Sequence, residues 1–197
     1  MQLPSTFSLA RYRFTLAADE PIHLPPNPGS TLRGGLGHAL RQMVCHQPQA
    51  DCRHCPLNPT CVHGYLFRTT PPDDAEVLSG LSAVARPFVI EPPRARRPDY
   101  WTGETFTFHF TLIGRAVDYL PYVVVAFQEL GRLGLGRGRG RFHPVRVEAV
   151  HPFTGETAAV FDAAHPDRVR TTALTVYRAA VADRAARVAA DAVTVVF

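Results

Sequence analysis

Four cysteines lie close together within the first third of the chain. Their spacing is C-x6-C-x2-C-x5-C, and they are Cys45, Cys52, Cys55 and Cys61. Intervals this short allow four thiolates to converge on one centre, and such sites hold either tetrahedral zinc or an iron–sulfur cluster. The segment therefore predicts a metal site. We expect a structural role for it, because nothing in the spacing indicates an open ligand position. The alternative is four cysteines without a metal, unligated or in disulfides.

Two further observations bear on which metal the cysteines hold. The histidines His46, His54 and His63 neighbour them and are alternative ligands if the metal is zinc. The cysteine spacing also resembles the [4Fe-4S] loop of the helix-hairpin-helix DNA glycosylases. This resemblance is confined to the loop, and it favours a [4Fe-4S] cluster slightly over structural zinc.

A second segment alternates glycine with arginine directly after an apolar, helix-like run. It reads GLGRGRGRF from Gly134 to Phe142. Glycine lets the main chain approach a ligand closely and adopt positive φ, and the planar guanidinium fork suits phosphate oxygens. The segment therefore predicts contact with a nucleic-acid backbone, and the alternative is a solvated, flexible basic loop. The arginines that we expect to bind RNA are Arg33, Arg132, Arg137, Arg139 and Arg141.

A histidine and an arginine lie close together on a glycine-rich helix. In the segment LRGGLGHALR, helical spacing places His38 and Arg41 within about 60° of each other, away from a leucine stripe. Histidine titrates near neutral pH, so this pair is suited to moving a proton beside a phosphate. The alternative is an ordinary surface histidine. The three glycines of the segment cost about 1 kcal/mol each relative to alanine, which predicts a close approach by backbone or ligand there.

The composition excludes several common chemistries. The chain has 197 residues, of which 46% are hydrophobic, and a formal charge of +4. All 21 basic residues are arginine, so there is no lysine for a Schiff base or a P-loop, although a GC-rich genome accounts for most of this bias. No apolar run approaches the ~18 residues of a membrane span, and the N-terminus does not read as a signal peptide. We therefore expect a cytoplasmic protein with no membrane partner, in a compartment where clustered cysteines indicate metal more often than disulfides.

Hydrophobic periodicity predicts the elements that position these residues. Ser30 is the expected N-cap of the first helix, and the Gly/Arg segment joins the second helix to the fourth strand. The order strand, helix, strand, strand, helix, strand predicts an α+β fold of the ferredoxin-like (RRM-like) type, with the cysteine segment as a metal-binding insertion. The predicted strands are residues 7–17, 85–91, 105–113 and 142–150, with a further strand or hairpin at 157–162, a helix at 172–190 and an apolar β run at 193–197.

In their order and spacing, these segments resemble the CRISPR-associated endoribonucleases that process precursor CRISPR RNA, which belong to the RAMP superfamily. The resemblance runs over most of residues 7 to 150. The matching segments are Gly29–Arg41, the cysteine block ending in Cys61–Phe67, Pro87–Pro93, Gly103–Glu104, Leu112–Gly114 and Gly134–Phe142.

The resemblance implies a reaction and roles for two residues. Family members cut the RNA repeat without a catalytic metal: a 2′-hydroxyl attacks the adjacent phosphate and leaves a 2′,3′-cyclic phosphate and a 5′-hydroxyl. The position that fits the family's general acid or base is His38. Arg41 then stabilises charge on the phosphate.

The resemblance also predicts how the chain is divided. Residues 1–152 form the ferredoxin-like RAMP domain, with the cysteine-rich insertion at 45–67. Residues 153–197 form a connecting segment, a helix and the start of a second domain. Family members have two ferredoxin-like domains, so we expect a truncated chain, a split protein, or a first domain that binds RNA without cutting it.

Three functions follow. The first is an endoribonuclease that cleaves CRISPR precursor RNA within its repeats, with the repeat RNA or crRNA as partner. The second is a non-catalytic RNA-binding or scaffold subunit of a CRISPR effector complex, partnered by other effector subunits. The third is a metal-cluster DNA-binding protein of unrelated role.

Overall fold

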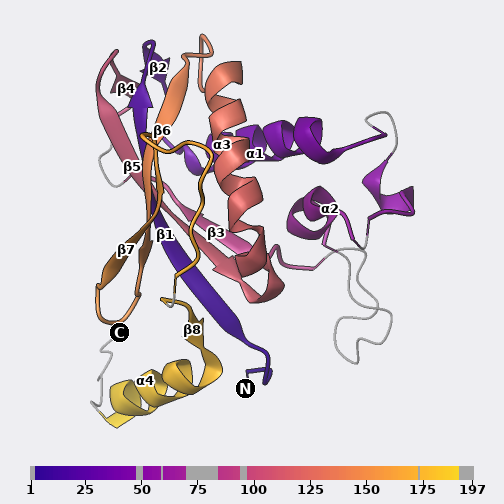
Figure 1. Cartoon of the computed structure of the whole chain (residues 1–197), viewed down its shortest axis with the longest axis vertical. Coiled ribbons are helices and arrows are strands. Elements are labelled where there is room, and N and C mark those ends of the chain that lie inside the picture. The colour runs from indigo at the N-terminus through magenta and orange to yellow at the C-terminus, as the bar shows by residue number, and fades with distance from the viewer. Residues whose placement is uncertain are drawn as a thin grey trace, which may run out of the picture.

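The alternating segments pair into one antiparallel sheet, seen in the computed structural model of Figure 1. The structure describes residues 3–47, 51–58, 60–69, 84–93, 97–172 and 174–190. The sheet has the order β3-β5-β1-β6-β7, with β8 paired to the start of β1. Its strands are β1 (Ser8–Ala18), β3 (Phe88–Glu91), β5 (Thr105–Ile113), β6 (Phe142–Val150), β7 (Thr157–Asp162) and β8 (Val176–Tyr177).

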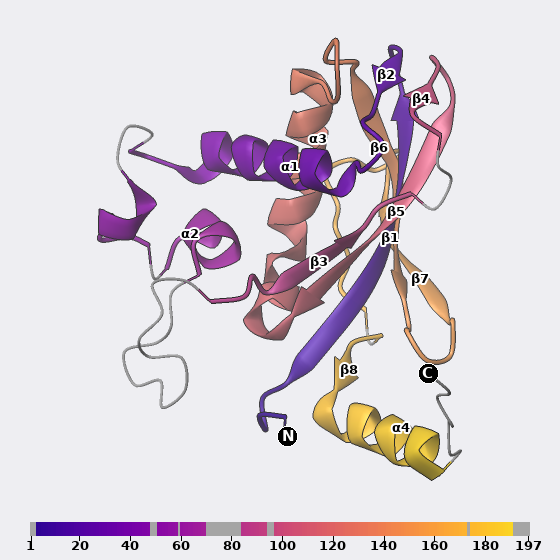
Figure 2. The ribbon, with the colours of Figure 1, turned by 180° about the vertical axis from the view of Figure 1, so that it is seen from behind.

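Helices cover one face of this sheet, as Figure 2 shows from behind. Helices α1 (Gly29–Val44) and α3 (Leu120–Leu133) pack together there, and the short α2 (Val62–Phe67) packs beside α1. Strands β1, β3, β5 and β6 with helices α1 and α3 reproduce the predicted order, so the ferredoxin-like fold is confirmed. Helix α4 (Arg178–Ala190) lies with β8 at the lower end of the views. Among the helices of the described residues, none has the length and apolar character that a membrane crossing requires.

Alternation along the strands places aromatic side chains between the sheet and α3. Phe14 of β1 is fully buried, and its ring stacks on that of Phe108 in β5 with centroids 5.2 Å apart. The ring of Phe127 in α3 packs on both, with centroid separations of 5.0 Å from Phe14 and 5.1 Å from Phe108. The long alternating strands thereby fix the register of β1 against β5, because a one-residue slip would move these rings to the opposite face.

Two sequence expectations about helix starts are wrong. Pro28, not Ser30, occupies the N-cap of α1, and the Ser30 hydroxyl instead donates to the Asn27 carbonyl at 3.4 Å. Pro28 already has a helical φ of −75°, so the helix begins two residues earlier than an N-cap at Ser30 would place it. The last helix begins at Arg178 and not at 172, because Val176 pairs with Leu9 of β1 as part of β8.

The predicted division of the chain stays a prediction. Strands β7 and β8, from the segment expected to connect to a second domain, both join the sheet of the first. The apolar run at 193–197 lies outside the described residues.

Candidate nucleic-acid interface

The Gly/Arg segment forms a folded loop between α3 and β6. Leu135 is buried in the core, its N–H donates to the Gly140 carbonyl at 2.9 Å, and the two residues form an antiparallel bridge. Between them the Arg139 N–H donates to the Gly136 carbonyl at 3.3 Å. The loop is therefore closed on itself by main-chain hydrogen bonds.

The loop is also joined to β2 (Ile22–His23) and to the turn before it. The Arg137 N–H donates to the His23 carbonyl at 2.9 Å. A Cβ on Gly136 would lie 2.2 Å from that carbonyl oxygen, and a Cβ on Gly140 would lie 2.1 Å from the Pro21 oxygen. Glycine is needed at these two positions because the protein's own main chain comes this close.

The tip of the loop presents two arginines to solvent. Arg137 and Arg139 are exposed and form no ion pair with another described residue. Gly138 between them has φ +89°, and Arg139 itself has φ +53°, the left-handed region that a side chain seldom adopts. Backbone strain of this kind is found where the surrounding structure imposes it, often at binding sites.

Arg141 at the base of the loop has a different environment. Its guanidinium Nη2 lies 2.6 Å from Glu20 Oε1, and its main-chain N–H donates to Glu20 Oε2 at 3.1 Å. Hydrogen bonds from Arg141 lower the pKa of the Glu20 carboxyl. The guanidinium of Arg141 is therefore paired within the protein, unlike those of Arg137 and Arg139.

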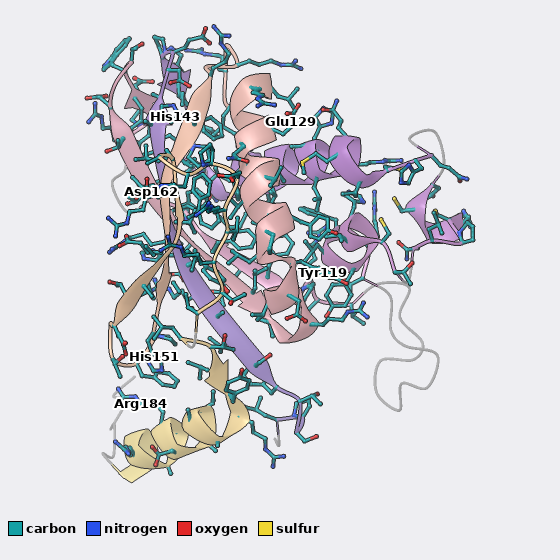
Figure 3. All side chains as sticks on the ribbon, viewed as in Figure 1. Tyr119, Glu129, His143, His151, Asp162 and Arg184 are labelled. Atoms are coloured by element: carbon teal, nitrogen blue, oxygen red, sulfur yellow. The ribbon has the colours of Figure 1, made fainter. Side chains whose placement is uncertain are left out.

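The five predicted RNA-binding arginines do not form one cluster. Arg132 and Arg141 both line a groove of 800 Å³ beside β6, together with His143. Arg132 Nη1 lies 3.5 Å from Glu129 Oε2. Figure 3 shows Glu129 and His143 towards the end of the sheet that carries the loop. Arg33 is exposed on α1. Their role in RNA binding stays a prediction.

The residues predicted for catalysis have different surroundings on α1. The His38 side chain is exposed. Arg41 is partly buried, and its charge acts on His63 of α2. Burial, together with the charges of Arg41 and Arg68, lowers the pKa of His63 to about 4. Arg41 therefore has a neighbour in the cysteine segment that helical spacing did not indicate, and the catalytic roles stay predictions.

Helix packing explains two of the three glycines beside His38. A Cβ on Gly35 would lie 2.8 Å from Leu130 of α3, and one on Gly37 would lie 2.9 Å from the Phe67 ring of α2. A Cβ on Gly34 would meet no atom within 4 Å. The expected close approach is thus made by neighbouring helices, at Gly35 and Gly37.

The four cysteines are free and partly exposed. Cys52 Sγ lies 3.8 Å from His63 Nδ1. Across the described part of the chain, no three His, Cys, Asp or Glu side chains are arranged to hold a metal ion. The metal site at these cysteines therefore stays a prediction.

Comparison with known proteins identifies the family of this chain. The family AF_1859_N, described as an N-terminal domain, matches residues 6–174. The chain belongs to this family. An uncharacterized protein of Archaeoglobus fulgidus is 32% identical over 113 residues, which are 57% of this chain and 37% of that protein. The match thus spans little more than a third of that relative's length.

A solved structure shares the fold of this AF_1859_N domain. It is a chain of the crystal structure of the Csm3-Csm4 subcomplex in the type III-A CRISPR-Cas interference complex. The match covers 86% of this chain and all of that chain, with a TM-score of 0.50 and 13% identity. At this identity the likeness concerns the fold alone.

Sequence reasoning missed two residues beside the loop. The only tryptophan, Trp101, is 55% exposed in the turn between β4 (Asp99–Tyr100) and β5. Its ring lies edge-on to that of His23, with centroids 6.1 Å apart. A lone tryptophan in a Thr-Gly-Glu turn was the available signal, but its proximity to the Gly/Arg loop arises only when β2 pairs with β4.

Proposed function

We propose that this domain binds RNA through the loop between α3 and β6. The observation that carries the proposal is the pair Arg137 and Arg139, both exposed and without an ion pair to any described residue. Main-chain hydrogen bonds hold the loop that bears them. Less conformational freedom is therefore lost when their guanidinium groups meet phosphates, which favours affinity.

We further propose that this RNA is a CRISPR RNA, bound within an effector complex. Two observations support this setting. The ferredoxin-like order of elements agrees with a RAMP-type domain, and the solved structure of similar fold comes from a CRISPR-Cas interference complex. In this reading the chain contacts crRNA and other effector subunits.

Titration of the chain into labelled nucleic acids tests the proposal. A single-stranded CRISPR repeat RNA and a DNA duplex of equal length are followed by fluorescence polarisation over a range of salt concentrations. We expect tighter, salt-sensitive binding of the RNA. A preference for the DNA duplex would contradict the proposal and favour a DNA-binding protein.

Cleavage of the bound RNA is a second candidate function, favoured by the exposed position of His38 on α1. In this reading His38 takes the proton from the 2′-hydroxyl as it attacks the adjacent phosphate, and the departing 5′-oxygen takes a proton from solvent water. Cutting should persist in EDTA, yield a 2′,3′-cyclic phosphate, and fall in His38→Ala. The exposed His165→Ala is the matched control. Loss of cutting in EDTA contradicts the metal-free reaction, and unchanged cutting by His38→Ala removes His38 from it.

A further inference from the structure

We propose that Trp101 is a stacking platform for an unpaired base of the bound RNA, next to the phosphate contacts of Arg137. This inference rests on the RNA binding proposed above. It adds a recognition element, because phosphate contacts alone do not distinguish single strands from duplexes, whereas a stacking surface requires a base with a free face.

The turn that carries Trp101 is held from several sides. The main-chain N–H of Trp101 donates to Glu104 Oε2 at 2.7 Å, and the main-chain N–H of Glu104 donates to the Trp101 carbonyl at 2.9 Å. Arg97 Nη2 holds the same carboxylate at 2.6 Å. The Gly103 N–H donates to the Ala18 carbonyl of β1 at 2.8 Å. The indole therefore stands on a fixed main chain, although more than half of its surface is exposed.

His23 connects Trp101 to the Gly/Arg loop. Its ring meets the indole at an interplanar angle of 89°, and its Nδ1 lies 2.7 Å from Asp99 Oδ1. The His23 carbonyl accepts the hydrogen bond of the Arg137 N–H. The exposed indole and the exposed cation thus lie on neighbouring segments at one end of the sheet (Figure 1).

An indole beside a guanidinium suits a single strand. Its flat face stacks on any base, and the arginine reaches a flanking phosphate. A base inside a duplex already has both faces covered by its neighbours, so it is not available for stacking on a protein ring. We therefore expect preference for single-stranded RNA over an RNA duplex, with little dependence on base identity.

The fluorescence of Trp101 gives a direct readout, because it is the only tryptophan of the chain. Oligouridylate and oligoadenylate strands of about 12 nucleotides, and a blunt RNA duplex of the same length, are titrated into the full chain. Both single strands should quench the fluorescence, and the duplex should quench it much less. By polarisation, Trp101→Ala should bind the single strands about tenfold more weakly, and Trp101→Phe should retain most of the affinity.

Phe153 provides the matched control. It is 42% exposed in the turn between β6 and β7, and its ring lies edge-on to that of His151, with centroids 5.8 Å apart. Phe153→Ala removes an aromatic of similar setting from another turn, so RNA binding should not change. Thermal unfolding of each variant identifies any that fails to fold. If Trp101→Ala fails to fold, Trp101→Phe still tests the stacking.

The outcomes separate this inference from the proposed function. Unchanged affinity in Trp101→Ala, or binding without quenching, overturns the stacking while RNA binding through Arg137 and Arg139 stands. Equal affinity for duplex and single strand also overturns it. If none of the RNAs binds, both proposals fail.

Discussion

Arg139 and Arg141 are two residues apart, yet their surroundings give them different roles. Glu20 pairs with the Arg141 guanidinium, which fixes the base of the loop. Arg139 has positive φ and an exposed side chain, with no ion pair to a described residue. Counting arginines in the sequence therefore overstates the charge that the loop presents to a ligand.

Arg137 and Arg139 should account for much of the salt dependence of RNA binding. Each phosphate contact to a single strand contributes about 0.7 to the slope of log K against log salt. The double variant Arg137→Ala/Arg139→Ala should therefore lose about 1.4 of that slope and roughly tenfold in affinity, measured by polarisation at several salt concentrations.

The same loss of charge at α4 gives the control. Arg178 and Arg184 are exposed on α4 and form no ion pair with a described residue, and Figure 3 shows Arg184 at the end of the sheet away from the loop. Arg178→Ala/Arg184→Ala should leave the slope almost unchanged. Equal losses in the two double variants would mean that net charge, not the loop, attracts the RNA.

Tyr12 of β1 should make the fold sensitive to alkali. Burial, together with the nearby Asp118, raises the pKa of the Tyr12 hydroxyl to about 12. The unfolded chain releases this proton near pH 10, so its contribution to stability is complete below pH 10 and is lost as pH rises towards 12. The loss should amount to roughly 3 kcal/mol.

Urea unfolding of the wild type and Tyr12→Phe between pH 9 and about 12 measures this contribution. The free energy of unfolding should fall more steeply with pH in the wild type, because phenylalanine has no proton to release. Parallel curves for the two proteins would show that Tyr12 is not protected from ionisation.

At the scale of elements, the end of α3 is fitted closely to the start of β6. A Cβ on Gly131 would lie 2.0 Å from the Phe142 carbonyl oxygen. This close approach sets the position from which the Gly/Arg loop departs. It is a main-chain contact, so it cannot be relieved by rotating a side chain.

Gly131→Ala should therefore destabilise the protein by roughly 2–4 kcal/mol, because β6 or α3 must shift. Gly34→Ala is the matched control, since it is also a helical glycine but its Cβ would meet nothing within 4 Å. It should stabilise the fold by up to about 1 kcal/mol. Thermal or urea unfolding compares them, and similar effects of the two substitutions would contradict the close packing at Gly131.

The sequence was informative where periodicity decides the structure. The long alternating strands at 105–113 and 142–150 match β5 and β6, because burial of one face needs only local spacing. The site was harder to predict. The contact between the Gly/Arg loop and His23 depends on β2, a strand of two residues that pairs with β4 far along the chain. Propensity carries no signal for such pairs, so Trp101 and His23 were missed.

At the scale of the whole molecule, the two arginines that β1 presents on the face of the sheet away from α1 and α3 are paired with carboxylates. Arg11 pairs with Glu91 at 2.7 Å, and Arg13 pairs with Glu148 at 2.7 Å. The outward positions of β1 and β5 contain no Phe, Tyr or Trp, and His109 is the one ring among them. An RRM binds bases on aromatics of its sheet. The end of the sheet, with its exposed arginines and indole, therefore fits the proposed RNA binding better than this face does.

We also propose that the whole protein carries a metal at its four cysteines, with [4Fe-4S] favoured over zinc. Protein purified without oxygen should contain iron and absorb visible light through thiolate-to-iron charge transfer, or contain zinc and absorb none. Cys52→Ser/Cys55→Ser should lose the metal in elemental analysis, and Thr60→Ala in the same segment should retain it. Wild-type protein without iron or zinc would contradict the proposal.

The alternation of the Gly/Arg loop divides its positions between two tasks. Residues 134, 136 and 140 face the protein's own carbonyl oxygens and accept only glycine, whereas the side chains of residues 137 and 139 extend outwards from a main chain bonded elsewhere. Substitutions other than proline at residue 137 therefore leave the hydrogen bonds of the loop intact, whereas residue 139, with φ +53°, favours glycine, asparagine or aspartate over β-branched side chains. The loop can therefore carry many different side chains at residue 137, and a restricted set at residue 139, so that ligand preference is varied on one unchanged main chain.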